Sequence, residues 1–262
     1  MKNVVITGST RGIGFSMAKE FLKNGCNVTL SGRGEALSEN AQAELSPYEG
    51  KYLYVPCNVQ DKKSIQNLWD ESCKRWGSID IWINNAGQNT PYTFSWETEE
   101  AYTKSVINTN VLGMIFGSQI AAKAMIKQGY CAIYSMEGLG SDNRIQEKTI
   151  LYGTGKCALT YFMRGLSKEL KGTGVIAGRL SPGMMLTDFI TKTPDGEPSE
   201  VISDERFKKI FNILADRPET VARYFVPKIL QNAKNGVQIR WLNGGKAAWR
   251  FMTAPFRKGR LI

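Results

Sequence analysis

The stretch MKNVVITGSTRGIG, residues 1–14, decides the fold of this chain. Its apolar run at residues 4–6 is typical of a buried parallel strand, and the amphipathic residues 15–22 predict a helix. A strand, a glycine turn and a helix bring backbone N–H groups onto a diphosphate, although a simple tight turn shows the same glycines. The predicted diphosphate site comprises Gly8, Ser9, Thr10, Arg11, Gly12, Ile13 and Gly14.

Strand-like and helix-like segments alternate along the rest of the chain. This alternation predicts an α/β fold, a doubly wound (Rossmann) seven-stranded parallel sheet with helices on both faces. The expected strands are Asn3–Thr7, Asn27–Ser31, Tyr52–Cys57, Asp80–Asn84, Cys131–Tyr134, Val175–Leu180 and Val237–Trp241. The expected helices include Lys62–Trp76, Glu99–Lys127, Ile150–Lys171 and Pro218–Asn232.

Size and composition are those of a soluble globular protein. The 262 residues suit one domain, residues 1–262, with 42% hydrophobic and 22% charged residues. No apolar run approaches the ~20 residues of a membrane span, and no leader precedes the first strand. The five scattered cysteines indicate free thiols in a reducing compartment. We therefore expect a cytoplasmic protein, or one of the plastid stroma or thylakoid surface if it is a processed plant protein.

The chain contains no histidine. This excludes Ser-His-Asp and Cys-His nucleophile systems and disfavours a zinc site, so we expect no metal. Acid–base chemistry must use Tyr, Lys, Asp or Glu.

Positive charge is concentrated at the C-terminal end. Of the net charge of +10, nine charges come from Lys and Arg in residues 220–262, which contain no Asp or Glu. Such a segment is typical of contact with an acidic partner, an anionic membrane or nucleic acid, and equally of a solvated tail. No nucleic-acid-reading module is present, so we expect no nucleic-acid partner.

Two arginines surround the position where a dinucleotide's adenosine ribose would lie. Arg33 follows the second strand, where an acidic residue would accept the ribose 2′-hydroxyl, and Arg11 lies in the glycine turn. Two guanidinium groups favour a 2′-phosphate, so the predicted cofactor is NADPH rather than NADH. Asn58 and Val59, after the third strand, are placed to meet the adenine.

Two further segments lie at strand ends on the same edge. Asn85, Ala86 and Gly87 follow the fourth strand, where small residues allow close packing under a cofactor; a turn without another role is the alternative. The irregular residues 191–200, after the sixth strand, indicate a mobile substrate loop or an ordinary surface loop.

Tyr152 and Lys156 are four residues apart at the start of a predicted helix, and therefore share one helical face. A nearby ammonium, and the positive nicotinamide of an oxidised cofactor, favour the phenolate and so lower the tyrosine pKa. This pair predicts that Tyr152 donates a proton to a carbonyl reduced by hydride, while Lys156 also holds the nicotinamide ribose.

The chain resembles the short-chain dehydrogenase/reductase family over nearly its whole length. The motifs that match, in order, are TGSTRGIG at 7–14, NNAG at 84–87, NVLG at 110–113, YGTGK at 152–156, and Pro182-Gly183 with Thr187. The resemblance implies that Asn110 holds a water of the proton relay behind Lys156. It also implies that Pro182, Gly183 and Thr187 lie along the nicotinamide.

One position departs from the family pattern. Gly138 stands about where the family places a serine that orients the carbonyl. Ser141 and Ser135 are the candidates to supply this hydrogen bond, and we favour Ser141, reaching back over a glycine-rich turn.

Within the family, the chain is similar to chlorophyll b reductases. The similar segments are GSIDIWINNAG at 77–87, EGLGS at 137–141, YGTGKCAL at 152–159, SPGMMLTDF at 181–189 and RPETVARYFVP at 217–227. A basic C-terminal extension, about residues 244–262, adds to the likeness. The resemblance implies NADPH-dependent reduction of the 7-formyl group of chlorophyll(ide) b to 7-hydroxymethyl. Another ketone, steroid or quinone-like substrate, or a catalytically silent NADP-binding partner, are the alternatives.

The predicted substrate loop, about residues 184–216, begins with Met184 and Met185, whose thioethers suit a large flat apolar substrate or simple core packing. Aromatic and basic residues alternate in the tail, which indicates peripheral membrane contact or docking on a partner subunit. The tail residues concerned are Trp249, Arg250, Phe251, Met252, Phe256, Arg257, Lys258 and Arg260. We also expect a homo-oligomer, formed through the long helix Glu99–Lys127.

Overall fold

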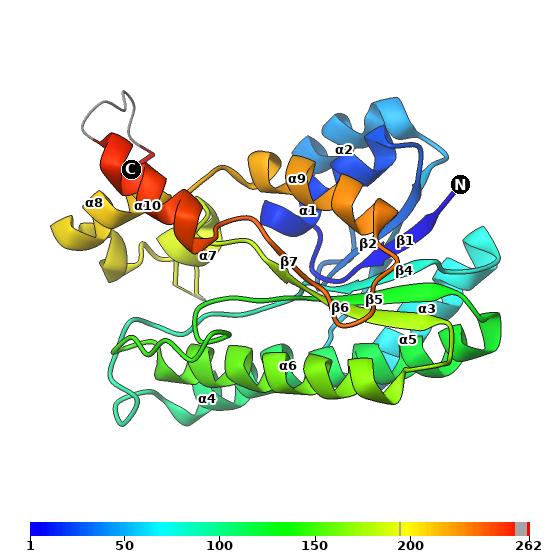
Figure 1. Cartoon of the computed structure of the whole chain (residues 1–262), viewed down its shortest axis with the longest axis horizontal. Helices are drawn as coiled ribbons and strands as arrows, with labels where there is room; N and C mark the ends of the chain where they lie inside the picture. Colours follow the sequence, from blue (N-terminus) through cyan, green and yellow to red (C-terminus); the bar gives the residue numbers. More distant parts are fainter. Residues whose placement is uncertain (194, 255–260) are drawn as a thin grey trace.

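Seven parallel strands form one sheet in the order β3-β2-β1-β4-β5-β6-β7 (Figure 1). The computed structural model describes residues 1–193, 195–254 and 261–262. The apolar strands β1 and β4 lie at the centre, buried along their whole length, as parallel strands covered on both faces must be. The predicted doubly wound α/β fold is confirmed. The strands are β1 (Asn3–Ile6), β2 (Asn27–Gly32), β3 (Tyr52–Pro56), β4 (Ile81–Asn84), β5 (Cys131–Met136), β6 (Val175–Ser181) and β7 (Gln238–Arg240).

Helices cover both faces of this sheet (Figure 1). One hydrophobic core lies under α1 (Gly12–Lys23), α2 (Glu39–Leu45) and α9 (Pro218–Gln231). The other lies under α3 (Lys62–Trp76), α5 (Met114–Gln128) and α6 (Ile150–Glu169), with α4 (Glu100–Ile107) extending that layer. A short 3₁₀ turn, Ser46–Tyr48, joins α2 to β3. The order of the strands reverses between β1 and β4, which places the ligand crevice at their carboxyl ends.

The predicted long helix from Glu99 to Lys127 is interrupted by a π-helical segment, Asn108–Gly113. Gly113 packs so tightly that an added Cβ would lie 2.9 Å from the Val59 carbonyl oxygen. The buried Asn110 side chain is bound to the backbone of Gln88. These contacts hold the wider turn in place, and π-helical segments of this kind are frequent at functional sites.

The region after β6 is more regular than its sequence indicates. It contains α7 (Asp188–Thr191), a 3₁₀ turn (Glu200–Ser203) and α8 (Glu205–Leu214). Asp204 begins α8 by accepting hydrogen bonds from the N–H groups of Arg206 and Phe207, at 2.7 and 3.1 Å. Within the predicted irregular stretch, Lys192 and Pro198 form an antiparallel bridge, and the Tyr102 hydroxyl bonds to Asp195. Tertiary contacts therefore order a segment that local propensity leaves open.

A C-terminal helix, α10 (Gly244–Thr253), packs against α8. Its Arg250 is buried, pairing with Asp216 at 2.6 Å and donating to the Leu214 carbonyl at 2.7 Å. Arg250 is thus a structural anchor and not part of an exposed basic face. Trp249, Phe251 and Met252 are exposed. Of the tail residues predicted to contact a membrane, Phe256, Arg257, Lys258 and Arg260 lie outside the described residues.

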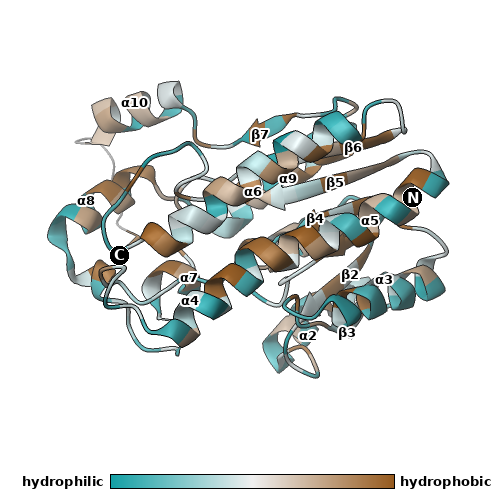
Figure 2. Ribbon diagram, turned by 90° about the horizontal axis from the view of Figure 1, so that it is seen from below, coloured by the Kyte–Doolittle hydropathy of each residue, from teal (hydrophilic) through white to brown (hydrophobic). Residues whose placement is uncertain are grey.

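Apolar residues continue onto the outer surface of the α4–α5–α6 layer (Figure 2). Leu112, Ile126 and Tyr161 are 38%, 45% and 83% exposed. In the described part of the chain, no helix has the length and apolar character that crossing a bilayer requires.

Candidate active site

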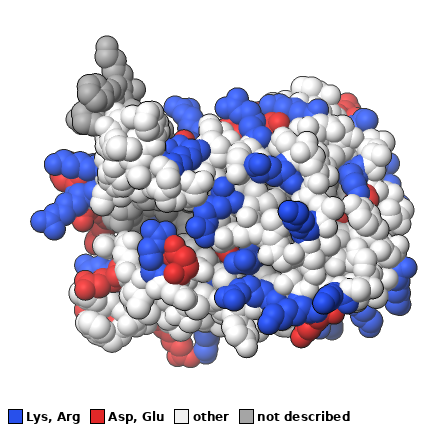
Figure 3. All heavy atoms as spheres, in the orientation of Figure 1, with Lys and Arg blue, Asp and Glu red and all other residues white. Residues whose placement is uncertain are grey.

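A cavity of about 1710 Å³ opens at the carboxyl edge of the sheet and extends from the glycine turn to α8. Figure 3 shows this face of the molecule hollowed below the lobe that carries α8 and α10. Small-molecule pockets usually measure ~300–1,000 Å³. The cavity therefore has room for a dinucleotide together with a second molecule.

The glycine turn is closely packed against the end of β4. Gly8 has a φ of +62°, and an added Cβ would lie 2.7 Å from the Cα of Ala86. At Gly14 an added Cβ would overlap the Asn85 amide and lie 2.6 Å from the Gly8 carbonyl oxygen. No side chain caps the first turn of α1 at Arg11, so its N–H groups face the cavity uncapped. The residues present therefore fit a diphosphate.

Thr7 and Asn85 hold the two strand ends together. The Thr7 hydroxyl accepts the N–H groups of Asn85 and Ala86, both at 3.0 Å. The Asn85 amide donates to the carbonyls of Thr7 and Gly8, at 3.0 and 2.8 Å. The amide oxygen of Asn85 is buried without a partner among the described residues, which leaves an acceptor for a ligand.

The predicted ribose end of the cavity is lined by Thr10, Arg11, Arg33, Asn58 and Val59. Both arginines are exposed, and Arg11 lies 3.4 Å from Asp188. An added Cβ at Gly32 would lie 2.5 Å from the Thr10 methyl, so the end of β2 packs closely on the glycine turn. Ser9 is the one predicted residue of the turn that does not line the described cavity: it is buried, donating to Ile6 and accepting from Ser31.

Tyr152 and Lys156 lie in the same cavity, one turn apart on α6. The Lys156 ammonium is 5.6 Å from the centre of the Tyr152 ring and donates to the Met136 carbonyl at 2.9 Å. The Tyr152 hydroxyl lies directly against Gly138, where an added Cβ would overlap it. The space that a serine would occupy in the family pattern is thus taken by the tyrosine itself.

Burial governs the protonation of this pair. It raises the pKa of the Tyr152 phenol, the opposite of the direction predicted from the neighbouring ammonium. Burial also lowers the pKa of Lys156 to about 8, opposed by the charge of Glu137. At neutral pH the phenol therefore keeps its proton and the amine its charge, which suits a site that donates a proton.

Asn110 lies behind this pair. Its amide accepts from the Gln88 N–H at 2.7 Å and donates to the Gln88 carbonyl at 2.8 Å. A Cβ placed on Gly87 would lie 3.6 Å from the Asn110 oxygen and 3.8 Å from the Lys156 nitrogen. The structure therefore brings Asn110, Lys156 and Tyr152 together, with Asn110 buried just outside the cavity wall.

The two candidate serines lie in different surroundings. Ser141 lines the cavity, but its hydroxyl accepts from the Gly138 N–H at 3.1 Å and donates to the Lys156 carbonyl at 3.3 Å. Ser135 is fully buried and accepts from the Asn84 amide at 3.3 Å, away from the described cavity. Ser141 therefore shapes the turn in which Tyr152 is seated.

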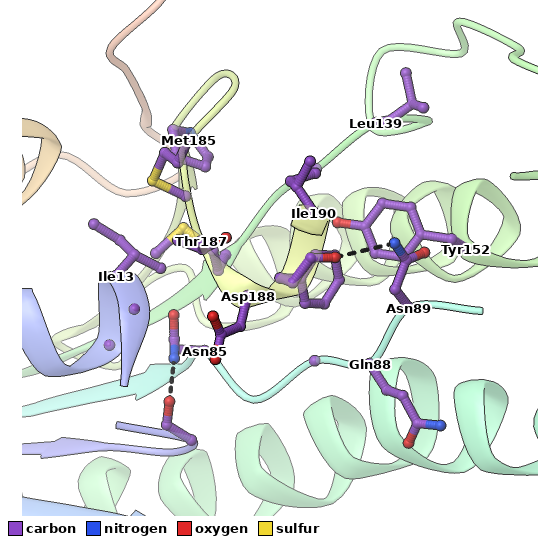
Figure 4. Close-up of a pocket in the computed structure, with 18 of the residues that line it drawn as sticks. Ile13, Asn85, Gln88, Asn89, Leu139, Tyr152, Met185, Thr187, Asp188 and Ile190 are labelled. Carbon is purple, nitrogen blue, oxygen red and sulfur yellow. Dashed lines mark hydrogen bonds between the residues drawn. The ribbon is translucent and has the colours of Figure 1, made fainter. Parts of the chain in front are cut away.

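Apolar residues such as Leu139, Met185 and Ile190 form part of the wall on the substrate side, beside polar residues such as Asn89 and Asp188 (Figure 4). The Phe189 ring meets Tyr152 edge-on at 5.4 Å between centres, and Asn89 donates to the Phe189 carbonyl at 3.2 Å. Met184 and Met185 are half-buried in the wall. Other lining residues include the predicted Pro182, Gly183 and Thr187, with Leu139, Ile190, Phe207, Ile210 and Leu214.

Sequence reasoning missed several of these residues. Asn89 lies two residues after the NNAG segment and Phe189 ends the SPGMMLTDF segment, so their places in the chain could have identified them. Glu137 was also missed, although a carboxylate at the end of a buried strand is unusual and could have drawn attention to it. Gln238 carries no local signal.

Two similar plant proteins are named as reductases. The chain is 32% identical to "Probable chlorophyll(ide) b reductase NYC1, chloroplastic" of Arabidopsis thaliana, over 99% of this chain and 54% of that protein. It is 34% identical to "Chlorophyll(ide) b reductase NOL, chloroplastic" of the same plant, over 94% of this chain and 71% of that protein. The chain thus spans about half the length of the first of these relatives.

Solved structures share the fold. A structure named ElxO, with NADP bound, superposes with a TM-score of 0.80 at 27% identity, covering 94% of this chain and 99% of that one. A 3-ketoacyl-(acyl-carrier-protein) reductase from Brucella melitensis superposes with a TM-score of 0.79 at 20% identity, covering 94% and 98%. The family model for short chain dehydrogenase matches residues 2–198. With its sheet, its glycine turn and its Tyr152–Lys156 pair, the chain belongs to the short-chain dehydrogenase/reductase family.

Proposed function

We propose that the protein is an NADPH-dependent carbonyl reductase that reduces the 7-formyl group of chlorophyll b or chlorophyllide b to 7-hydroxymethyl. One observation carries the proposal: the protonated phenol of Tyr152 and the glycine turn that would bind a dinucleotide lie in the same cavity. The size of the cavity beyond that phenol, with Phe189, Ile190 and Leu214 in its wall, supports a large carbonyl substrate.

The residues of the chain account for the proton half of the reaction. Bound NADPH supplies the hydride. Tyr152 donates its phenolic proton to the carbonyl oxygen as negative charge develops there. The Lys156 ammonium stabilises the phenolate that results, and Asn110 fixes the loop beside both groups through Gln88. The Phe189 ring, edge-on to Tyr152, covers one side of the phenol.

The preference for NADPH rests on Arg11 and Arg33. Both are exposed at the ribose end, and Arg33 stands at the position where a carboxylate would select NADH. We expect Arg33→Asp to weaken NADPH binding by about 10²-fold, because two charge-assisted hydrogen bonds to the 2′-phosphate are lost. Binding of NADH, which has no 2′-phosphate, should change little. Cofactor titration by intrinsic fluorescence measures both affinities. Arg223→Asp, on the exposed face of α9, is the matched control.

Equal losses for NADPH and NADH in the Arg33→Asp protein would refute the 2′-phosphate assignment. A loss of the same size in Arg223→Asp would trace the effect to net charge instead.

The pigment assignment draws on the relatives named above and on the size of the cavity. Protein incubated with NADPH and chlorophyllide b is expected to convert the absorption spectrum to that of the 7-hydroxymethyl product. A parallel reaction with NADH, and one with a small ketone, complete the experiment. An unchanged pigment spectrum beside rapid reduction of the ketone would reject the pigment.

A second substrate class has one specific observation in its favour. The chain is 27% identical to a 3alpha-hydroxysteroid dehydrogenase of Mediterraneibacter gnavus, over 86% of this chain and 88% of that protein. A steroid ketone is therefore the comparison substrate to include.

We further propose a homo-oligomer formed through the exposed apolar residues of the α4–α5–α6 layer, and peripheral membrane contact through Trp249, Phe251 and Met252.

A further inference from the structure

A buried carboxylate lies at the carboxyl end of β5, next to the catalytic groups. Glu137 is 3% exposed and lines the cavity. It stands between Met136, whose carbonyl accepts the Lys156 ammonium at 2.9 Å, and Gly138, against which the Tyr152 hydroxyl lies. In the chain, Glu137 is therefore directly adjacent to the residue that contacts Lys156 and to the residue that contacts Tyr152.

Residues of the two neighbouring strands, β6 and β7, hold Glu137 in place. Arg179 of β6 pairs with one carboxylate oxygen at 3.0 Å, and Gln238 of β7 donates to the other at 2.5 Å. The Glu137 N–H donates to the Leu180 carbonyl at 2.8 Å, and Arg240 donates to the Gln238 amide oxygen at 2.8 Å. The carboxylate is therefore fixed, and its only full cationic partner within this network is Arg179.

Stability alone gives no reason for this arrangement. A buried ion pair contributes little more than apolar residues of the same volume, because desolvation offsets the attraction. The Glu137 side chain is 1% exposed and that of Arg179 is 17% exposed, so the desolvation falls mainly on the carboxylate. A negative charge retained at this cost, in the wall of the active site, indicates a role in the chemistry.

Among the groups that surround Lys156, Glu137 is the source of negative potential. On its own helix Lys156 faces Tyr152, and the β4 loop and the π-helical segment present the uncharged Gly87 and Asn110. Of the charged groups in the described residues, Glu137 is the one that opposes the effect of burial on Lys156.

We propose that Glu137 is a positioning residue of this active site: its carboxylate, held by Arg179 and Gln238, keeps Lys156 an ammonium and fixes the Gly138 turn under Tyr152. The proposal rests on the carbonyl-reductase function only for its catalytic consequence. The charge of Lys156 can be measured without turnover.

The test is the pH dependence of Lys156 reductive methylation by formaldehyde, followed by mass spectrometry of the peptide, without cofactor or substrate. Only the neutral amine reacts, so the labelling midpoint reports its protonation. We expect Glu137→Gln to lower the midpoint by about 0.5–1 pH unit, because the carboxylate no longer favours the ammonium. Arg179→Gln should raise it, since the carboxylate is then less neutralised. Glu137→Asp retains the charge with poorer contacts and should leave the midpoint near that of the parent.

An unchanged midpoint in Glu137→Gln, or an equal fall in Glu137→Asp, would overturn the proposal and leave Glu137 a packing residue. If Glu137→Gln does not fold by circular dichroism, Arg179→Gln decides: an unchanged or lowered midpoint in that variant overturns the proposal. In the parent enzyme we expect activity to fall as rising pH deprotonates Lys156. In Glu137→Gln this fall in activity should occur at lower pH. Absent turnover in the parent refutes the carbonyl-reductase function while the labelling result stands by itself.

Discussion

Replacing Tyr152 with phenylalanine is expected to lower the turnover of the carbonyl substrate by about 10²–10⁴-fold, with NADPH binding nearly unchanged. The phenol is the one group of the described site placed to supply a proton beside Phe189 and Gly138, and burial raises its pKa so that the proton is present at neutral pH. Removing one hydroxyl leaves the ring and its packing in place. Single-turnover oxidation of NADPH, followed by absorbance, measures the loss.

Tyr161→Phe provides the matched control for this experiment. Tyr161 lies on the same helix, α6, but is 83% exposed. Its replacement should leave both turnover and cofactor affinity at the parent values. Turnover retained in Tyr152→Phe would remove the assigned proton donor, whereas a parallel loss of NADPH affinity would show that the hydroxyl serves binding.

Replacing Gly14 with alanine is expected to weaken NADPH binding by about 10–10²-fold. The added methyl would overlap the Asn85 amide and come 2.6 Å from the Gly8 carbonyl oxygen and 2.9 Å from the Ser9 Cα. Two of these neighbours are backbone, so the turn must move, and overpacking of this kind costs about 1–3 kcal/mol. Displacement of the Asn85 amide also disturbs the buried acceptor beside the cavity. Isothermal titration with NADPH measures the change.

The control for Gly14→Ala is Gly165→Ala, in the interior of α6. An added Cβ there meets nothing within 4 Å, so alanine should stabilise the helix by about 0.5–1 kcal/mol in urea unfolding. Its affinity for NADPH should match that of the parent. Full affinity in Gly14→Ala would show that the turn is not the diphosphate site.

Local sequence signals predicted the elements that build the site. The run Val4–Ile6 and the glycines that follow predicted β1, the turn and α1, because the apolar run and the glycine spacing can be read from neighbouring residues. The spacing of Tyr152 and Lys156 placed both on one face of α6 for the same reason. Helix Glu99–Lys127 was predicted whole, and its π-helical interruption at Asn108–Gly113 was missed, because that turn depends on packing against Val59.

The choice between serines shows a second limit. The sequence left both Ser135 and Ser141 as candidates, with Ser141 favoured, and the structure buries Ser135 against Asn84 and leaves Ser141 in the cavity wall. Helix α10 is a similar case, because its anchor Arg250 depends on Asp216, which no local pattern links to it. Contacts between residues far apart in the chain decide such questions.

By itself, the sequence determined the order of strands and helices, the glycine turn and the shared face of Tyr152 and Lys156, since each depends on residues a few positions apart. Only the tertiary structure decided which charges are buried and which groups meet. It joined Glu137 to Arg179 and Gln238 across three strands and seated Tyr152 on Gly138. It also set the direction of the Tyr152 pKa, because desolvation depends on everything that packs around a group and not on its neighbours in sequence.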